Sequence, residues 1–219
     1  RRSGRGAGGA GLVMRVRLAL AALLALGASA CVSFEVAPVE PLGCDAALAG
    51  AWLPADAGPD DAPAVVTADC GVTGLRGAKP DERQAFGTFE FDGHRYIAVA
   101  ADDAERVVDG AGRLVETWPA NRVELYRYRL DGDRLLLWAA DPGTARTLGG
   151  DGLTVHADDR RDPAGGKPVP RAIAGDVYLS GSREAIAEAL RRHGDALYRG
   201  MRPELATTLH RAPPGDATP

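Results

Sequence analysis

The chain has 219 residues, of which 45% are hydrophobic, 26% are charged and 5% are aromatic. This composition is too apolar for a disordered protein, and the chain is long enough to enclose a hydrophobic core. The formal net charge of −4 argues against a nucleic-acid-binding protein, which needs a basic face. Beyond the N-terminus the sequence has no apolar run of the length that spans a bilayer, which excludes a polytopic membrane protein.

Residues 14–30 have the pattern of a secretory signal. Two arginines precede a short apolar run at 18–26, and small residues follow it. This order of a basic, an apolar and a small-residue region is typical of a cleaved signal peptide, and the apolar run is too short for a stable transmembrane helix. Residues 1–13 lie before Met14, and we expect them to be an over-translated upstream segment; the alternative is a genuine Gly/Arg-rich extension.

The end of this signal contains a cysteine. The sequence Ala28-Ser29-Ala30-Cys31 resembles the lipobox of bacterial lipoproteins. The resemblance implies that Cys31 is diacylated, that the signal is cleaved before it, and that its new amino group is also acylated. In such lipoproteins an aspartate at the next position commonly signals retention in the inner membrane. Because Val32 stands there, we expect a lipid-anchored protein of the outer membrane that faces the periplasm; the alternative is an ordinary signal peptide with an incidental cysteine.

The mature chain is acidic. Without residues 1–30, which contain five arginines and no acidic residue, 21 basic and 30 acidic side chains remain, a formal charge of −9. Anionic headgroups repel such a body, so we expect the acyl chains alone to provide the anchor. The lipobox resemblance implies a lipidated cysteine at the start of a tether at 31–43. From composition we predict one β-rich domain at 44–211 with long loops at 54–64 and 157–171, and a disordered tail at 212–219.

Two cysteines remain once Cys31 is lipidated. Cys44 and Cys70 are an even pair in an oxidising compartment, which favours a disulfide. The alternatives are two buried thiols or a pair of metal ligands. No CxxC motif or histidine cluster accompanies the cysteines, which argues against zinc.

The strongest local structural signal is a hairpin around Asp92-Gly93. This dipeptide separates two alternating segments and predicts a two-residue type I′ turn. The resulting register pairs Glu90 with Arg95 and Phe89 with Tyr96, an ion pair and an aromatic pair that support each other.

A second hairpin is predicted around Gly132-Asp133. A turn at this dipeptide pairs Asp131 with Arg134, whereas the alternative register, shifted by one residue, would oppose two arginines. The favoured register also places Arg127 opposite Trp138 and predicts a cation–π contact.

A helix is predicted over residues 183–193. Ser182 can cap its N-terminus, apolar residues follow with helical spacing, and His193-Gly194 places a glycine at its C-terminal end. We therefore predict a mainly β (α+β) fold, an antiparallel meander or partly closed barrel with one C-terminal amphipathic helix on the sheet. Further strands are predicted at 48–53, 64–68, 153–156 and 172–179.

Two segments carry a resemblance to known proteins. Gly50 and Trp52 match a Gly-x-Trp sequence on the first strand of small lipocalin-like bacterial lipoproteins, where the tryptophan plugs the barrel floor. The stretch 177–195 is similar to the strand–helix ending of an uncharacterised family of proteobacterial lipoproteins. The resemblance implies an eight-stranded barrel, but fewer strands are evident in the sequence.

No motif for catalysis is present. The sequence contains no nucleophile elbow, P-loop, Rossmann fingerprint or HExxH motif. The four histidines are scattered, and the acidic pairs lack the ordered spacing of a calcium loop. We therefore expect no cofactor, no metal and no enzymatic activity. The histidines are His94, His156, His193 and His210.

Aromatic side chains on the predicted strands are the better candidates for binding. If the sheet curls, some of them would line its interior and contact an apolar ligand, although plain core packing is the alternative. The candidates are Trp52, Tyr126, Tyr128 and Trp138.

Three functions remain open. We favour a non-catalytic envelope domain that binds an apolar small molecule or a periplasmic protein. The second is an inhibitor or immunity-type lipoprotein that blocks a cell-wall-degrading enzyme, and the third is an envelope hydrolase. A large apolar cavity would favour the first, a protruding acidic loop the second, and converging His, Asp and Ser side chains the third.

Overall fold

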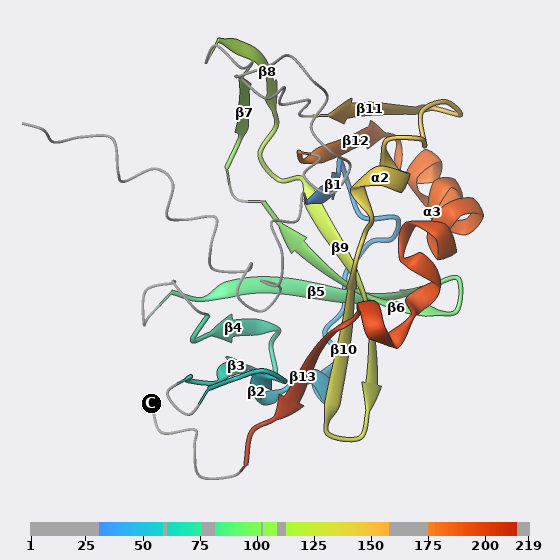
Figure 1. Cartoon of the computed structure of the whole chain (residues 1–219). Helices are drawn as coiled ribbons and strands as arrows, with labels where there is room; N and C mark the ends of the chain where they lie inside the picture. The colour runs from blue at the N-terminus through green and yellow to red at the C-terminus, as the bar shows by residue number, and fades with distance from the viewer. Residues whose placement is uncertain are drawn as a thin grey trace, which may run out of the picture.

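The computed structural model describes residues 31–58, 61–75, 82–101, 103–108, 113–157 and 175–213. In these residues the fold is mainly β: a closed antiparallel barrel, a three-stranded extension of its sheet, a separate hairpin and one main C-terminal helix (Figure 1). The predicted fold class is confirmed, and the barrel closes completely.

The barrel strands follow the order β10-β13-β2-β3-β4-β5-β6-β9, and β9 pairs back to β10. Every one of these pairings is antiparallel. Inward and outward side chains therefore alternate along each strand. The strands are β2 (Gly50–Pro54), β3 (Ala64–Val66), β4 (Gly71–Thr73), β5 (Gln84–Phe91), β6 (His94–Ala100), β9 (Val123–Asp131), β10 (Arg134–Ala139) and β13 (Thr207–Arg211).

Two of these strands, β4 and β13, were not predicted. β4 has only three residues, too few for a period-two pattern to be recognised. β13 closes the barrel because it pairs with β10 through Leu209 and Leu135, and with β2 through Arg211 and Trp52.

Both predicted hairpin registers are confirmed. Glu90 lies opposite Arg95 in the first hairpin, and Asp131 lies opposite Arg134 in the second. The cation–π prediction, in contrast, is wrong in its partner. Arg127 is opposite Trp138 in register, but the guanidinium over the Trp138 ring is that of Arg129, 5.8 Å from the centroid. Arg127 instead turns toward the helix that covers this face.

The segment predicted as a tether is partly built into the fold. β1 (Val32–Phe34) pairs with β9 and, in parallel, with β12 (Val177–Gly181), which in turn pairs with β11 (Leu153–Ala157). Val32 and Phe34 are almost completely buried. The tether prediction is therefore wrong for these residues, because their apolar side chains fill the core between β9 and the helix.

The helix α3 (Arg183–Leu197) begins as predicted, since the Ser182 hydroxyl accepts a hydrogen bond from the amide of Ala185. It does not end at His193-Gly194: Gly194 is buried inside the helix. In Figure 1, α3 lies along one side of the barrel, and it packs on the outer face of β6, β9 and β10 and on the extension. Among the described residues, one core cluster lies inside the barrel, a larger one lies beneath α3, and there are two smaller clusters.

The remaining elements are short. Ala212 is buried and its amide donates to the carbonyl of Ala51, so the predicted tail does not begin at this residue. Residues 214–219 of that tail, the signal at 14–30 and most of the loop at 157–171 lie outside the described residues. No helix among the described residues is long and apolar enough to cross a membrane. The short elements are η2 (Ala46–Leu48), β7 (Glu105–Val108), β8 (Leu114–Trp118), α2 (Pro142–Ala145), η4 (Arg199–Met201) and η5 (Pro203–Leu205).

Candidate functional site

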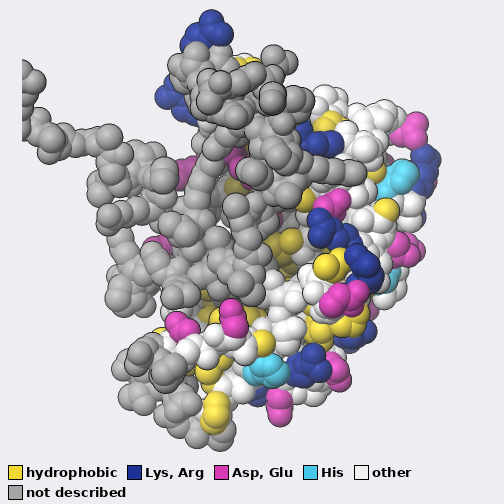
Figure 2. Space-filling view, in the orientation of Figure 1, with side chains coloured by type: hydrophobic (Ala, Val, Ile, Leu, Met, Phe, Trp, Pro, Cys, Tyr) yellow, Lys and Arg dark blue, Asp and Glu magenta, His cyan; other side chains and the backbone are white. Residues whose placement is uncertain are grey.

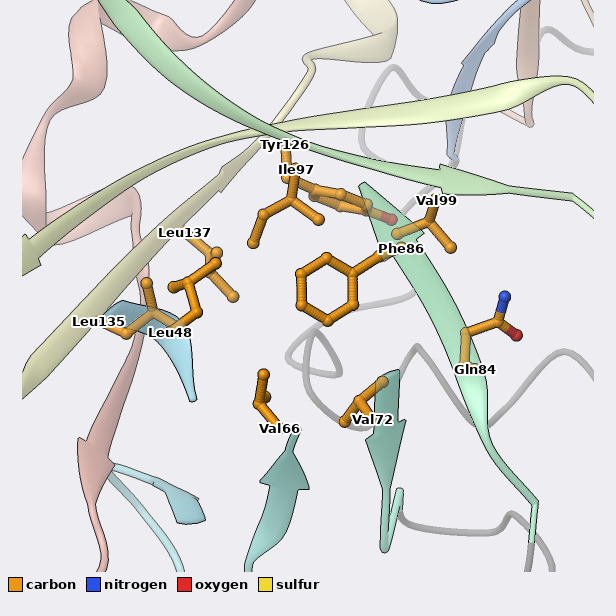
Figure 3. Close-up of a pocket in the computed structure, with 10 residues that line it drawn as sticks. All are labelled: Leu48, Val66, Val72, Gln84, Phe86, Ile97, Val99, Tyr126, Leu135 and Leu137. Carbon is orange, nitrogen blue, oxygen red and sulfur yellow. The ribbon is translucent and has the colours of Figure 1, made fainter. Parts of the chain in front are cut away.

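The barrel encloses a cavity of about 70 Å³ (Figure 3). Its walls are almost entirely hydrocarbon and aromatic, and Gln84 is the one lining residue with an amide side chain. The lining residues are Leu48, Val66, Val72, Gln84, Phe86, Ile97, Val99, Tyr126, Leu135 and Leu137.

The strand registers explain why these side chains converge. Ile97 lies opposite Tyr126, and Phe86 lies opposite Val99, so alternate residues of three neighbouring strands share the inner face. In Figure 3 the Phe86 ring projects into the middle of the group.

The cavity is accessible from solvent. Val66, Phe86 and Ile97 point into the barrel, yet each is only half-buried. The cavity is therefore partly open along these side chains.

Trp52 packs beside the cavity, in one buried cluster with the lining residues Leu48, Leu135 and Leu137. The Trp52 indole is fully buried, and its Nε1 donates to the carbonyl of Leu48 at 2.8 Å. The guanidinium of Arg211 covers the ring at 4.4 Å from the centroid, and Tyr128 donates from its hydroxyl to Asp45 at 2.7 Å. These bonds satisfy the polar atoms of both aromatic side chains, which fixes the two rings in this cluster.

A polar pair lies beside the cavity at Tyr126. Its hydroxyl donates to the carboxylate of Glu124, the residue opposite Val99 on the same inner face. Burial raises the pKa of Glu124, although the hydrogen bond from Tyr126 opposes the shift. Burial also raises the pKa of Tyr126 well above its ordinary value, so the hydroxyl stays protonated and remains a donor.

The four aromatic residues proposed from the sequence have three different positions. Tyr126 lines the cavity, whereas Trp52 and Tyr128 belong to the core cluster inside the barrel. Trp138 lies outside the barrel beneath α3, where its Nε1 donates to the carbonyl of Arg202 at 3.0 Å. Side chains alternate between the two faces of β10, so Trp138 points outward because its neighbour Leu137 points into the barrel.

Most of the lining residues were missed by the sequence analysis because they are ordinary aliphatic side chains. Val72 and Leu135 carry no chemical signal that distinguishes a cavity wall from a packed core. Strand alternation could have assigned Leu135 and Leu137 to one face, but the space between the opposite walls is a property of the closed barrel.

The disulfide is confirmed. Cys44 and Cys70 are bonded, with their Cα atoms 5.6 Å apart. Cys44 precedes η2, which supplies Leu48 to the cavity, and Cys70 precedes β4, which supplies Val72. The bond therefore holds together two walls of the site that are distant in sequence.

Comparison of the chain with protein-family models, with curated proteins and with solved structures finds no match. Among the described residues, no group of three or more His, Cys, Asp and Glu side chains is placed to hold a metal ion. The function must therefore be argued from the geometry of the barrel itself.

Proposed function

We propose that this protein is a lipid-anchored binding domain of the bacterial envelope whose barrel holds a narrow apolar ligand. The observation that supports this proposal is the solvent-accessible cavity inside the barrel, lined by aliphatic and aromatic side chains. Pockets of this kind gain affinity from apolar burial and specificity from a few polar groups.

The size and charge of the cavity define the class of ligand. Its volume of about 70 Å³ is well below the roughly 150 Å³ that accommodates a benzene ring in a protein core. The cavity therefore has room for only the end of an unbranched alkyl chain, and the rest of the ligand would lie outside it. The Glu124 carboxyl beside Tyr126 disfavours an anionic head nearby, so the ligand we propose is a neutral amphiphile with a straight chain.

The proposed anchor lies next to the folded domain. Cys31 is exposed, its amide donates to Asp176 at 2.7 Å, and β1 begins at the next residue, Val32. Acyl chains on Cys31 would therefore hold the barrel against the membrane surface rather than at the end of a flexible tether. This placement supports a ligand drawn from the lipid phase of the outer membrane.

The part of the surface around α3 that Figure 2 shows gives no comparable support to the inhibitor alternative. In Figure 2, basic and acidic side chains are intermixed around α3 on the visible face. Arg191 and Arg192 both pair with Glu188 there. An acidic patch for a basic enzyme would require uncompensated carboxylates on one surface.

Binding of octyl glucoside below its micellar concentration, measured by isothermal titration calorimetry, tests the proposal. Val66→Phe should fill the cavity and abolish binding, whereas Val65→Phe, at the neighbouring half-buried position on the opposite face of β3, should bind like the wild type. Octanoate should bind more weakly than the neutral glucoside. Equal binding by the two variants would contradict the proposal, as would no binding to the wild type.

A further inference from the structure

A second group of polar side chains lies outside the barrel, between the hairpin β7–β8 and the outer strands of the extension. The Nε2 atom of His156 is 2.8 Å from the hydroxyl oxygen of Ser180, and its Nδ1 atom is 2.6 Å from Oε1 of Glu116. The three residues come from β11, β12 and β8. We propose that Ser180 is a nucleophile activated by His156, and that this site hydrolyses esters.

The proton positions follow from the two contacts. A carboxylate oxygen only accepts hydrogen bonds, so the contact with Glu116 places a proton on Nδ1 of His156. In the neutral ring Nε2 is then an acceptor, and the Ser180 hydroxyl donates to it. A serine whose proton points at an imidazole base, with the base oriented by a carboxylate, is the arrangement that activates a serine nucleophile.

The carboxylate of Glu116 is itself held in place. Its second oxygen, Oε2, accepts a hydrogen bond at 3.0 Å from Nε1 of Trp118, which is fully buried. Trp118 packs against Tyr178 between the hairpin and the extension. Glu116 and Trp118 are therefore positioning residues, since they act on the serine only through His156.

The imidazole ring is also fixed by stacking. The His156 ring lies over the Tyr178 ring, with centroids 5.0 Å apart and planes 25° from parallel. Arg122 covers the same tyrosine at 5.9 Å and is neutralised by Glu105 at 3.0 Å. His156 thus has a carboxylate partner in Glu116, while Ser180 remains partly exposed to solvent.

The step that we propose is an acyl transfer. The Ser180 oxygen attacks the ester carbonyl carbon while its proton passes to Nε2 of His156. The ester C–O bond then breaks, the alcohol leaves with that proton, and the acyl group stays on Ser180. Water attacks the acyl-serine with His156 again as the base, which releases the carboxylic acid and restores the hydroxyl. This activity goes beyond ligand binding in the barrel and does not depend on it.

Covalent labelling by a biotinylated fluorophosphonate tests the proposal on the purified protein. The wild type should be labelled on the peptide that contains Ser180, and p-nitrophenyl acetate should add an acetyl group to the same residue. Ser180→Ala should not be labelled, and His156→Gln should slow labelling by about 100-fold or more, the contribution typical of a general base. Thr154→Ala, which alters the residue opposite Ser180, should be labelled at the wild-type rate.

The role of Glu116 has a separate readout. In the wild type, the ¹⁵N chemical shifts of His156 should show the proton on Nδ1, and Glu116→Gln should lose this preference and label more slowly while remaining folded by circular dichroism. Labelling of the folded wild type no faster than of Ser180→Ala would overturn the proposal. Modification only at other residues would overturn it as well.

Discussion

The guanidinium of Arg127 occupies the space that a side chain at position 194 would need. A Cβ atom on Gly194 would lie 2.3 Å from Nη2 of Arg127, and this buried arginine bonds to the hydroxyl of Tyr96 and to Asp195 of the helix. The glycine inside α3 is therefore required by tertiary contact, and it does not mark the end of the helix.

Gly194→Ala should destabilise the protein by about 1–3 kcal/mol, the usual cost of overpacking, although helix propensity alone would favour alanine by about 1 kcal/mol. Urea unfolding measures this difference. In an Arg127→Met background the same substitution should be neutral or stabilising, because the space is then free. Equal costs in both backgrounds would contradict this explanation.

Loss of the disulfide should lower the free energy of unfolding by about 3 kcal/mol, because the bond between Cys44 and Cys70 closes a loop with a sequence separation of 26. Urea unfolding with and without a reductant measures the effect. The double variant Cys44→Ala/Cys70→Ala should show the lower stability and no further response to the reductant. A wild type with two alkylatable thiols in its native state would refute the disulfide.

Glu124→Gln should change the pH dependence of stability. Burial raises the pKa of Glu124 in the folded state, so the unfolded chain ionises first as the pH rises above about 4.5, and the folded state loses relative stability until its own pKa is passed. Below that window the two proteins should be similar in stability, and at pH 7 the glutamine variant should be more stable, by about 1.4 kcal/mol for each pKa unit of the shift. Parallel stability curves from pH 4 to pH 7 would contradict this prediction.

Cys31→Ser should abolish the lipid anchor. The wild type should incorporate labelled palmitate and fractionate with outer-membrane markers, whereas the variant should do neither, because the thioether can form only on a cysteine. Cys44→Ser, which removes a cysteine inside the domain, should keep the label. A Cys31→Ser protein that is labelled like the wild type would show that the anchor lies elsewhere.

The sequence by itself determined the local structure of this protein. Asp92-Gly93 fixes the first hairpin because both residues adopt positive φ, and the pairing of Asp131 with Arg134 selects the second register, since like charges opposite each other are unfavourable. The pairing of Cys44 with Cys70 was predicted from the even number of cysteines that remain beside Cys31.

Only the tertiary structure decided how these parts close and which side chains meet. β13 forms a strand because it pairs with both β10 and β2. Position 194 inside the helix requires glycine because Arg127 fills the space that a side chain would need. Glu116, His156 and Ser180 lie on three strands separated by dozens of residues, and no local pattern links them. Contacts between distant segments depend on how whole sheets and hairpins pack, which short-range propensities do not encode.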